Sequence, residues 1–416
     1  MTIVREIAGQ EHDHVLAFRD EATGLNGFLA IHSLKAGPAV GGVRIQPYRS
    51  DLAALTDALR LSRAMTYKVA LAELPCGGGK AVIVDHPGFK REAAMQEFGR
   101  FVEQCGGRFF TGPDAGVTAE DMVQVRSTTK YCADETSPEL GDLAVHTAMG
   151  VWHAMRICLA AAKIEEPVVA IQGVGSVGMQ LARILHENGC ELIVADTNRK
   201  RARAAAKEFG AEMVSTDEIV SAICNVFAPC AMGGVISAES IPTLKARVIC
   251  GSANNVLNAP EDGDELHRLG ILYAPDYLAN AGGIIRGAEY YFQHRKDSRA
   301  SIERIGSRMQ KVIELSVARD RGTSRIADEL AEGLWKHPAH PAGQVRATQG
   351  AASPIVDLAA ARAKRPVQPG ANQPLAPAPP QGVRRDVIPG ASRGAARDKR
   401  RRATHKRRRR DRIPID

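Results

Sequence analysis

Residues 167–178, PVVAIQGVGSVG, decide the fold of this 416-residue chain. An apolar strand runs directly into three glycines with the spacing Gly-x-Gly-x-x-Gly, and the sequence that follows, 179–185, is typical of a helix. Gly173 permits a tight turn, Gly175 lets a pyrophosphate touch backbone N–H groups at a helix N-terminus, and Gly178 lets the helix pack on the strand. This order predicts a Rossmann dinucleotide-binding domain.

The next predicted strand, 191–195, ends at Asp196, roughly 20 residues beyond the glycines, where this fold places a carboxylate for the adenosine ribose. A carboxylate there binds both ribose hydroxyls and repels a 2′-phosphate. NAD is therefore favoured over NADP, although Arg199 and Lys200 keep NADP as an alternative. A glycine-rich turn without a ligand is the other interpretation, and the full order of strand, turn, helix, strand and acid argues against it.

Two lysines lie twelve positions apart in the first half of the chain: Lys68 in MTYK and Lys80 at the end of LPCGGGK. The glycine run is expected to form a flexible turn without side chains, so that Lys80 can face a small substrate closely. Lys68 follows a helical stretch, 51–67, and could reach the same site. A phosphate-binding loop is excluded because Ala81, not Ser or Thr, follows Lys80. Two surface lysines beside a turn are the plainer alternative.

A third polar residue, Asp114, follows the predicted strand 107–111 in a Gly-Pro-Asp turn. It could lie near the two lysines, although an aspartate in this context is equally typical of a turn or a helix cap. A dinucleotide domain preceded by a domain with two lysines suggests hydride transfer to or from an anionic small molecule. Its ligand is expected between the domains.

Short apolar strands alternate with helical stretches, as in an α/β protein with parallel sheets. We expect an α/β fold: an N-terminal α/β substrate domain, a Rossmann domain with C-terminal helices returning across the cleft between the two, and a disordered basic tail. The expected boundaries are 1–140, 141–335 and 336–416. Strands are expected at 27–33, 39–46, 80–84, 107–111, 167–172, 191–195, 224–227 and 247–250, and helices at 51–67, 91–104, 145–162 and within 281–335.

Composition indicates a soluble protein. No apolar run reaches the ~18 residues that a membrane span needs, and the first residues lack an apolar signal core, so we expect a cytoplasmic location. The eight cysteines form no CxxC pair, and several lie in apolar runs such as 248–250, which indicates reduced thiols used as small hydrophobic residues. Neither cysteine nor histidine spacing matches a metal site, and no metal is expected.

The net charge of +8 is concentrated in the tail. Residues 362–416 hold 17 Lys and Arg against 4 Asp and Glu, a net charge of +13, which leaves −5 for residues 1–361. The proline-rich segments 366–370 and 375–380 and the basic run 399–410 predict disorder. A basic run can bind nucleic acid, but no aromatic residues or folded nucleic-acid motif accompany it, so we favour a solvated tail.

Further motifs follow one another in both halves of the chain. The first half holds GGVR at 41–44, MTYK at 65–68, LPCGGGK at 74–80 and TGPD at 111–114. The second half holds APCAMG at 228–233, GSANN at 251–255 and YAPDYLANAGG at 273–283. In order and spacing these motifs resemble the glutamate/leucine/phenylalanine/valine dehydrogenase family over residues 10–335.

The resemblance implies roles for the polar residues. Lys68 would hold the substrate α-carboxylate, Lys80 would polarise the carbonyl and activate water, Asp114 would exchange protons with the amine, and Asn280 would orient the amino group. To act as a base near neutral pH, Lys80 must have its pKa lowered by ~3 units from about 10.4, and burial beside the Lys68 cation acts in that direction. The implied cofactor contacts are Gly173, Gly175, Ser176, Val177, Gly178, Asp196, Thr147, Cys230, Ala231, Ala253 and Asn254.

The implied reaction converts an L-amino acid, NAD⁺ and water to a 2-oxo acid, ammonium and NADH. Thr147 follows Leu143 to His146 in place of the Pro-Ser-Pro of leucine-type members, and His146 itself is expected to be a helix-start residue. Val40 precedes the substrate-binding Gly41 and Gly42 where glutamate-type members carry lysine, which favours an apolar amino acid.

Gly112 stands where leucine-type members carry alanine and phenylalanine-type members carry glycine. One methyl group changes discrimination by only ~1–3 kcal/mol, so leucine, phenylalanine and valine all remain candidate substrates.

The resemblance also implies a homo-oligomer assembled through the first domain. Two other functions stay open on the sequence. One is a nucleic-acid-binding protein with a degenerate dehydrogenase body, which the presence of Lys68, Lys80, Asp114 and the glycine pattern disfavours. The other is an imine-reducing or hydroxy-acid dehydrogenase with the same cofactor.

Overall fold

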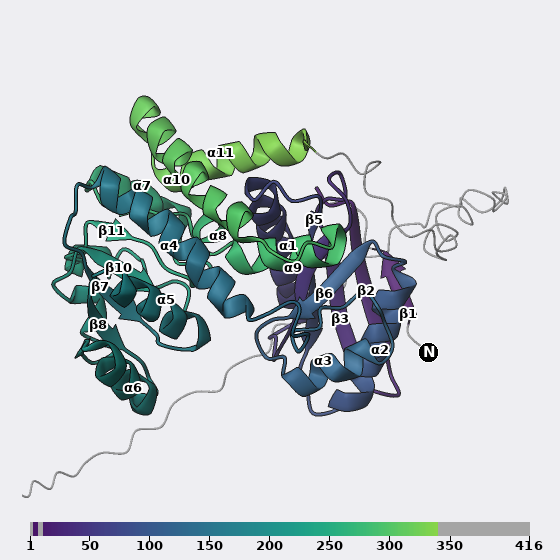
Figure 1. Ribbon diagram of the computed structural model, residues 1–416. Coiled ribbons are helices and arrows are strands. Elements are labelled where there is room, and N and C mark those ends of the chain that lie inside the picture. The colour runs from purple at the N-terminus through teal and green to yellow at the C-terminus, as the bar shows by residue number, and fades with distance from the viewer. Residues whose placement is uncertain (1–2, 7–10, 340–416) are drawn as a thin grey trace, which may run out of the picture. The chain divides into compact units, whose positions relative to one another are not determined.

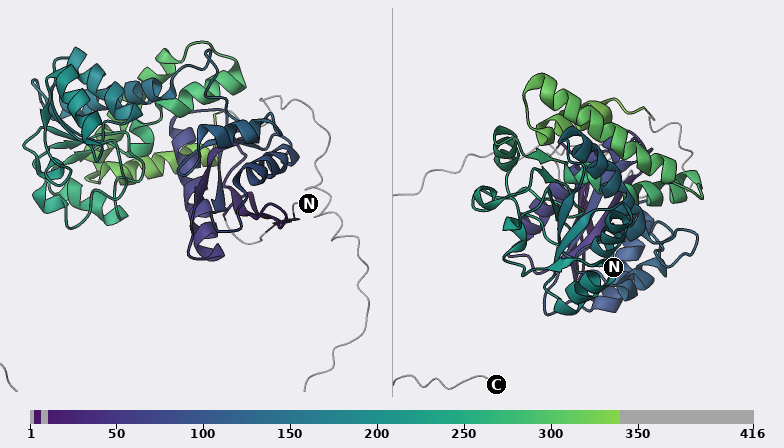
Figure 2. Two further views of the ribbon diagram at one scale, coloured as in Figure 1. Left: turned by 90° about the horizontal axis from the view of Figure 1, so that it is seen from below. Right: turned by 60° about the vertical axis from the view of Figure 1, so that its left-hand side comes forward.

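The computed structural model describes residues 3–6 and 11–339 (Figure 1). Residues from 340 onward are not among those described, so the predicted disordered tail beyond that position and its basic run lie outside the described residues. The α/β architecture predicted from the sequence is confirmed, with two six-stranded sheets that each have their own helices (Figure 2). No helix in 3–6 and 11–339 is long and apolar enough to cross a membrane.

The first sheet has the strand order β1-β2-β3-β5-β4-β6. Strand β4 pairs in parallel with both β5 and β6. The other three pairs, β1 with β2, β2 with β3 and β3 with β5, are antiparallel. The expectation of a parallel sheet is therefore wrong here. Residues 21–24 alone connect β2 to β3, and so short a connection permits only an antiparallel hairpin. The strands are β1 Ile3–Glu6, β2 His14–Asp20, β3 Leu25–Ile31, β4 Ala39–Gln46, β5 Gly77–Val84 and β6 Phe109–Pro113.

Alternating side chains of the first sheet pack against helices on its two faces. Leu29 and Ile83 join a core with Phe98 of α2 (Arg91–Gln104), whereas Phe28 and Val82 join a second core with Ala58 of α1 (Asp51–Leu71). Such alternation is what a strand with both faces covered requires. Helix α3, Ala119–Arg126, follows β6.

The second sheet is parallel throughout, with the order β12-β11-β10-β7-β8-β9. Strands β8 and β9 follow β7 on one side of it, and the chain then crosses to the other side of β7, where it adds β10, β11 and β12. A ligand site is expected at the carboxyl ends of β7 and β10, because the strand order reverses there. The strands are β7 Val168–Gln172, β8 Glu191–Ala195, β9 Glu212–Met213, β10 Val226–Pro229, β11 Val248–Ile249 and β12 Leu272–Tyr273.

The remaining helices lie in the second half of the described chain, from α4 onward. Three long C-terminal helices confirm the helical prediction for 281–335, and the last of them contacts α1, where the Tyr67 hydroxyl donates to Glu332 Oε1 at 2.7 Å. The helices are α4 Leu143–Ala161, α5 Ser176–Glu187, α6 Arg199–Phe209, α7 Pro260–Arg268, α8 Asp276–Ala279, α9 Gly282–Gln293, α10 Arg299–Arg319 and α11 Thr323–Lys336, with 3-10 turns at Ile219–Ser221 and Ile241–Thr243.

Candidate active site

Lys80 and Asp114 form an ion pair across the first sheet, in which β4 lies between β5 and β6. Lys80 lies on β5 with its side chain 8 % exposed, and Asp114 follows the last residue of β6 with its side chain 22 % exposed. The structure therefore brings together the two residues predicted to be catalytic. Of the two plainer interpretations of Asp114, the helix cap is wrong, because Thr118 caps α3, and the turn is confirmed, because the Val117 N–H donates to the Asp114 carbonyl at 3.1 Å.

The surroundings lower the pKa of both members of this pair. Burial lowers the pKa of the Lys80 amine, the Asp114 charge opposes that shift, and the Arg44 cation adds to it. Burial raises the pKa of the Asp114 carboxyl, but the charges of Lys80 and Arg44 outweigh burial and lower it overall. An amine that loses its proton more readily than an ordinary lysine thus shares one site with a carboxylate that is held in its charged form.

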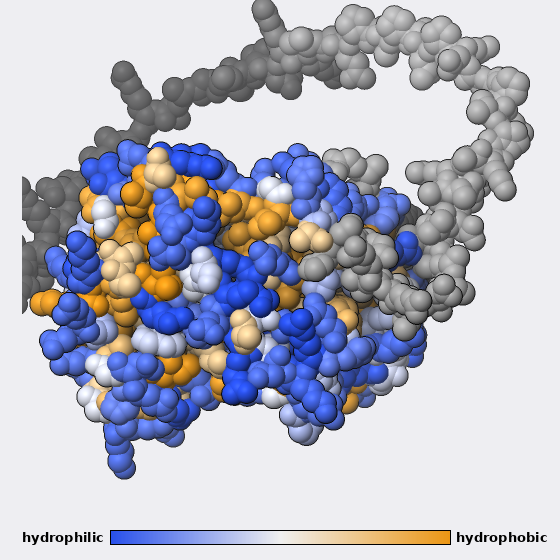
Figure 3. Space-filling view, turned by 45° about the horizontal axis from the view of Figure 1, so that its top comes forward, coloured by the Kyte–Doolittle hydropathy of each residue, from blue (hydrophilic) through white to orange (hydrophobic). Residues whose placement is uncertain are grey.

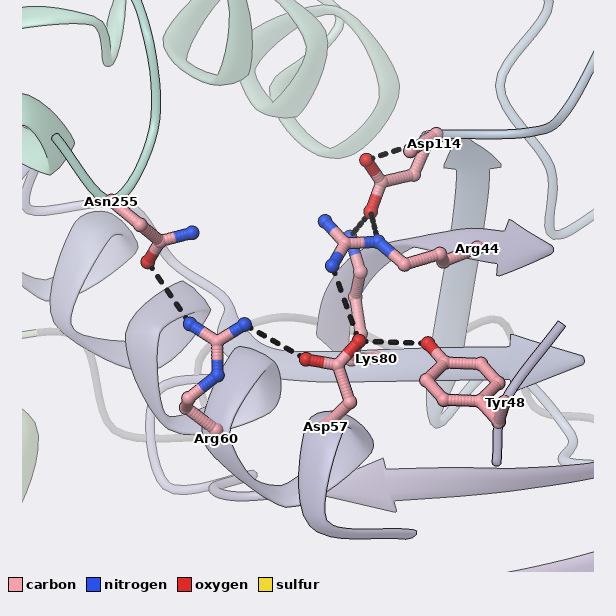
Figure 4. Close-up of polar contacts among 8 residues, drawn as sticks. Arg44, Tyr48, Asp57, Arg60, Lys80, Asp114 and Asn255 are labelled. Atoms are coloured by element: carbon pink, nitrogen blue, oxygen red, sulfur yellow. Dashed lines mark hydrogen bonds and ion pairs between the residues drawn. The ribbon is translucent and has the colours of Figure 1, made fainter. Parts of the chain in front are cut away.

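Arg44 of β4 adds a second cation to the pair (Figure 4). Its Nε lies 3.3 Å from Asp114 Oδ2, and its Nη1 donates to Asp57 Oδ2 of α1 at 3.2 Å. Arg44 belongs to the GGVR motif, but no pattern in the sequence assigns a role to it or to Asp57. The pairing depends on α1 lying beside β4, which no local pattern reports.

Lys68 lies in the last turn of α1, because the helix continues past the predicted end to Leu71. Its Nζ donates to Asn280 Oδ1 at 2.6 Å. Burial lowers the pKa of Lys68 to about 8, with Asp276 opposing and Lys80 adding to the shift. The two predicted substrate-binding residues Lys68 and Asn280 are therefore in direct contact across 212 positions of sequence.

Asp276 is a site residue that sequence reasoning missed. It is 9 % exposed at the start of α8, and its Oδ2 accepts the Val256 N–H at 2.8 Å. Burial raises the pKa of its carboxyl, although the Lys68 cation and the backbone hydrogen bond oppose the shift. The buried Asp276 carboxylate favours the charged form of Lys68, although burial outweighs it. The available signal was an acid four residues before Asn280 in the YAPDYLANAGG motif.

The glycine run before Lys80 is not a flexible turn. Gly77, Gly78 and Gly79 are the first residues of β5, and none has a positive φ. A methyl group at Gly78 would lie 2.1 Å from the Thr66 backbone nitrogen, and one at Gly79 would lie 2.9 Å from the Phe109 ring. The expectation of an open turn is wrong because packing fills the space, and these glycines instead let α1 and β6 approach β5 closely.

The residues predicted to face the substrate side chain lie on β4 and β6. Val40 is 9 % exposed, and β4 pairs with β6 so that Gly42 is opposite Gly112. A methyl group at Gly41 would lie 1.7 Å from the Gly79 carbonyl oxygen, so Gly41 is needed for the close strand contact. A methyl group at Gly112 would meet only the Ala133 side chain, at an ordinary 3.5 Å.

The glycine loop after β7 has the geometry that a dinucleotide requires. Gly173 has a φ of +94°, and a methyl group at Gly178 would lie 2.0 Å from the Gly173 carbonyl oxygen. Gly175 caps α5, and nothing within 4 Å would meet a methyl group there. Ser176 and Val177 are the first residues of α5. Their backbone N–H groups lie beside the open space at Gly175, where a helix N-terminus favours an anion.

Asp196 lies beside this loop at the carboxyl end of β8. Its Oδ2 accepts the Val174 N–H at 3.0 Å, and its Oδ1 accepts the Asn198 N–H at 2.7 Å. These hydrogen bonds hold the carboxylate at the rim of a surface pocket of about 700 Å³, which Arg199 also lines. A second pocket, of about 630 Å³, is lined by Thr147, Ser176 and Val177 among others.

The other predicted cofactor residues lie at the ends of β10 and β11. The Cys230 N–H donates to the Gln172 carbonyl at 2.7 Å, and the Ala253 N–H donates to the Pro229 carbonyl at 2.9 Å. Ala231 faces Gly173, and Asn254 Oδ1 accepts from Asn280 Nδ2 at 2.8 Å. The amide of Asn280 thus joins Lys68 to the loop that carries Asn254.

His146 and Thr147 lie near the start of α4. His146 Nδ1 lies 2.8 Å from the Asp142 carbonyl oxygen, so it is a helix-start residue as expected. The Thr147 hydroxyl donates to the Leu143 carbonyl at 2.8 Å and lines the second pocket. Within the described residues, no group of three or more His, Cys, Asp or Glu side chains could hold a metal ion.

A parallel sheet with a glycine loop at its switch point, next to a mixed sheet with a buried lysine–aspartate pair, defines a two-part dehydrogenase. Comparison with known families agrees: residues 12–138 match the Glu/Leu/Phe/Val dehydrogenase dimerisation domain, and residues 191–320 match the Glutamate/Leucine/Phenylalanine/Valine dehydrogenase domain. The chain belongs to the glutamate/leucine/phenylalanine/valine dehydrogenase family, whose members are NAD(P)-dependent oxidoreductases.

Individual relatives are similar over most of their length. Leucine dehydrogenase of Geobacillus stearothermophilus is 43 % identical over 344 residues, which are 80 % of this chain and 93 % of that protein. Phenylalanine dehydrogenase of Bacillus thermotolerans is 40 % identical over 299 residues, which are 69 % of this chain and 78 % of that protein. The crystal structure of L-tryptophan dehydrogenase from Nostoc punctiforme superposes with a TM-score of 0.69 at 36 % identity, covering 78 % of this chain and 96 % of that one.

Proposed function

We propose that this chain catalyses the NAD-dependent oxidative deamination of an apolar L-amino acid to its 2-oxo acid and ammonium, with residues 1–140 binding the substrate and residues 141–335 binding NAD. The observation that carries the proposal is the buried Lys80–Asp114 ion pair, with Lys68 held nearby by Asn280. In the reaction, the amino acid, NAD⁺ and water give the 2-oxo acid, ammonium, NADH and one proton.

Lys68 is the group that binds the α-carboxylate. The residue as a whole is half-buried, and burial of its amine lowers the pKa to about 8. A substrate carboxylate beside the amine would favour its charged form and oppose that shift. Asn280 Oδ1 accepts from Lys68 Nζ, while the Asn280 amide nitrogen faces the Ser252 and Ala253 carbonyls. This fixed amide presents one oxygen toward the space that the substrate amino group would take.

Lys80 and Asp114 divide the proton transfers. Because its pKa is lowered, Lys80 can lose its proton and take one from the attacking water. Once protonated, its ammonium stabilises the negative oxygen that develops on Cα. Asp114 Oδ2 then exchanges a proton with the departing amine, while its Oδ1 stays fixed by the Ala115 N–H at 2.7 Å.

The dinucleotide loop fits NAD. Bound NAD⁺ supplies the acceptor for the hydride that leaves Cα. The open space at Gly175 and the N-terminus of α5 suit the pyrophosphate, and Asp196 suits the ribose hydroxyls. A 2′-phosphate would meet the Asp196 charge, which supports NAD over NADP, while Arg199 in the same pocket is the residue that would favour NADP.

The side-chain end of the site is apolar, as a leucine, phenylalanine or valine side chain requires. Val40 stands beside Gly41 and Gly42, and Gly112 leaves room for at least one methyl group. The names of the relatives, which include leucine, phenylalanine and L-tryptophan dehydrogenases, support this class of substrate.

We also propose that the protein works as a homo-oligomer in the cytoplasm. The match of residues 12–138 to a dimerisation domain supports the assembly, and one face carries hydrophobic residues in groups between hydrophilic ones (Figure 3). All eight cysteines are free thiols and seven of them are buried, which suits a reducing compartment.

The test is a panel of L-amino acids assayed by NADH absorbance, with NADP⁺ in parallel. We expect NADH from apolar amino acids, little from glutamate and little activity with NADP⁺. The reverse reaction should require ammonium, which a hydroxy-acid dehydrogenase would not. If no amino acid yields NADH, and the protein instead binds DNA or RNA in a salt-dependent way that is lost on removing 362–416, the proposal is wrong.

A further inference from the structure

The catalytic pair is held by a chain of ion pairs that runs from Asp114, just after β6, through Arg44 on β4 to Asp57 on α1. Asp114 Oδ2 contacts both Lys80 Nζ and Arg44 Nε, the latter at 3.3 Å. The same guanidinium extends its Nη1 to Asp57 Oδ2 at 3.2 Å. Figure 4 shows the Arg44 guanidinium between the two carboxylates, and the Lys80 side chain beside it with its end at Asp114.

Asp57 is itself fixed on both of its oxygens. Its Oδ2 also accepts the Tyr48 hydroxyl at 2.7 Å, and its Oδ1 accepts Arg60 Nη2 at 2.8 Å. The Asp57 and Arg44 side chains are 14 % and 19 % exposed, so water screens these contacts only in part. A carboxylate with this many donors keeps one orientation and thereby fixes the guanidinium that it binds.

We propose that Arg44 is a positioning residue for the catalytic pair: anchored by Asp57, its planar guanidinium holds the Asp114 carboxylate against Lys80. This inference rests on the proposed deamination. A lysine at position 44 could supply the charge but not a planar fork that reaches two carboxylates at once.

Arg44 also acts through its charge. Removing this cation raises the pKa of Asp114 and of Lys80, because it lowers both in the intact site. The base form of Lys80 would then appear only at higher pH. The charged and titratable groups that act on this site from β4, α1, β5, α8 and the neighbouring loops are Arg44, Tyr48, Asp57, Lys68, Lys80, Asp114 and Asp276.

The experiment compares the full chain with Arg44→Gln, Arg44→Lys and Asp57→Asn in oxidative deamination between pH 7 and pH 11. For Arg44→Gln we expect kcat to fall about 10- to 100-fold from misplacement of the carboxylate, with the amino-acid KM changed less than about twofold. The midpoint of the rise in activity with pH should move upward by about 0.5–1 unit. Arg44→Lys should keep the midpoint but lose kcat, and Asp57→Asn should lower kcat less than Arg44→Gln does.

Arg325→Gln is the matched control. Arg325 of α11 binds Asp264 of α7 through Nε at 3.1 Å and Nη2 at 2.7 Å, so its loss removes a forked arginine–carboxylate pair that contacts neither Lys80 nor Asp114. It should retain kcat and the pH midpoint. The inference is overturned if Arg44→Gln keeps the wild-type kcat and pH profile, or if Arg325→Gln loses as much kcat as Arg44→Gln. An unaltered chain that forms no NADH from any amino acid overturns the proposed function, and this inference with it.

Discussion

Two glycine-rich segments of the chain do opposite things. At Gly77 to Gly79 the space where side chains would stand is filled by the neighbouring backbone and by the Phe109 ring. At Gly175 the corresponding space is open, and Gly173 in the same loop has the positive φ of a tight turn. The first set of glycines brings a helix and strands together behind Lys80, and the second leaves room for a ligand. Glycine spacing alone cannot tell packing from binding.

The largest effect is expected just beyond the filled segment, at Lys80. Lys80→Ala removes the base and the cation that stabilises the oxyanion, and we expect kcat to fall by about 10³-fold or more. NADH binding, measured by fluorescence titration, should be intact because the glycine loop is untouched. Lys130→Ala, which alters an exposed lysine outside the site, should keep the wild-type kcat. Near-normal turnover by Lys80→Ala would contradict the mechanism.

Lys68→Ala separates binding from chemistry. Loss of a charge-assisted contact to the substrate carboxylate should raise the amino-acid KM about 10- to 100-fold, which corresponds to ~1.5–3 kcal/mol. The fall in kcat should be smaller than for Lys80→Ala. Initial rates over a wide range of amino-acid concentration measure both constants. An unchanged KM would mean that Lys68 does not hold the carboxylate.

Two single substitutions, Gly78→Ala and Gly175→Ala, test whether the first glycine segment serves packing and the second serves ligand binding. Gly78→Ala forces a methyl group against Thr66 and should destabilise the protein by about 1–3 kcal/mol, which lowers the Tm by several degrees. Gly175→Ala meets no protein atom, so its Tm should be unchanged while its Kd for NADH rises about tenfold, ~1.4 kcal/mol. Calorimetry and NADH titration distinguish the two. The contrast fails if Gly175→Ala unfolds more readily or if Gly78→Ala keeps the wild-type Tm.

The smallest effect is expected at Gly112, where a methyl group fits against Ala133 without a clash. Gly112→Ala should fold normally and shift the ratio of kcat/KM for phenylalanine over leucine downward by about tenfold or less. The measurement is kcat/KM for both amino acids with the wild type and the variant. A ratio that stays constant would remove Gly112 from the side-chain pocket.

The sequence allowed much of this to be predicted, and the exceptions have physical causes. The strand, glycine loop, helix and Asp196 were predictable because a local backbone pattern dictates them. The order of motifs predicted that Lys68, Lys80 and Asp114 belong to one site, and the structure brings them together. Asp57 and Asp276 were not identified, because tertiary packing brings Asp57 of α1 to Arg44 of β4 and Asp276 of α8 to Lys68 of α1.

The mixed first sheet and the filled glycine run were predicted wrongly for a related reason. A short apolar strand has the same composition whether its neighbour runs parallel or antiparallel, and only the short connection 21–24 distinguishes the two. The LPCGGGK segment has the composition of a turn, yet β5 uses all three glycines in extended form. Tertiary packing overrides local preference at both places.

The pH profile of oxidative deamination tests most directly whether the buried lysine of the Lys80–Asp114 pair does the chemistry. Because the pKa of Lys80 is lowered, kcat/KM should rise with pH as Lys80 loses its proton, with a midpoint below the ordinary lysine value of 10.5. In Lys80→Ala the small remaining activity should lack this rise. A Lys80→Ala enzyme whose activity still rises with the wild-type midpoint would show that another group is the base.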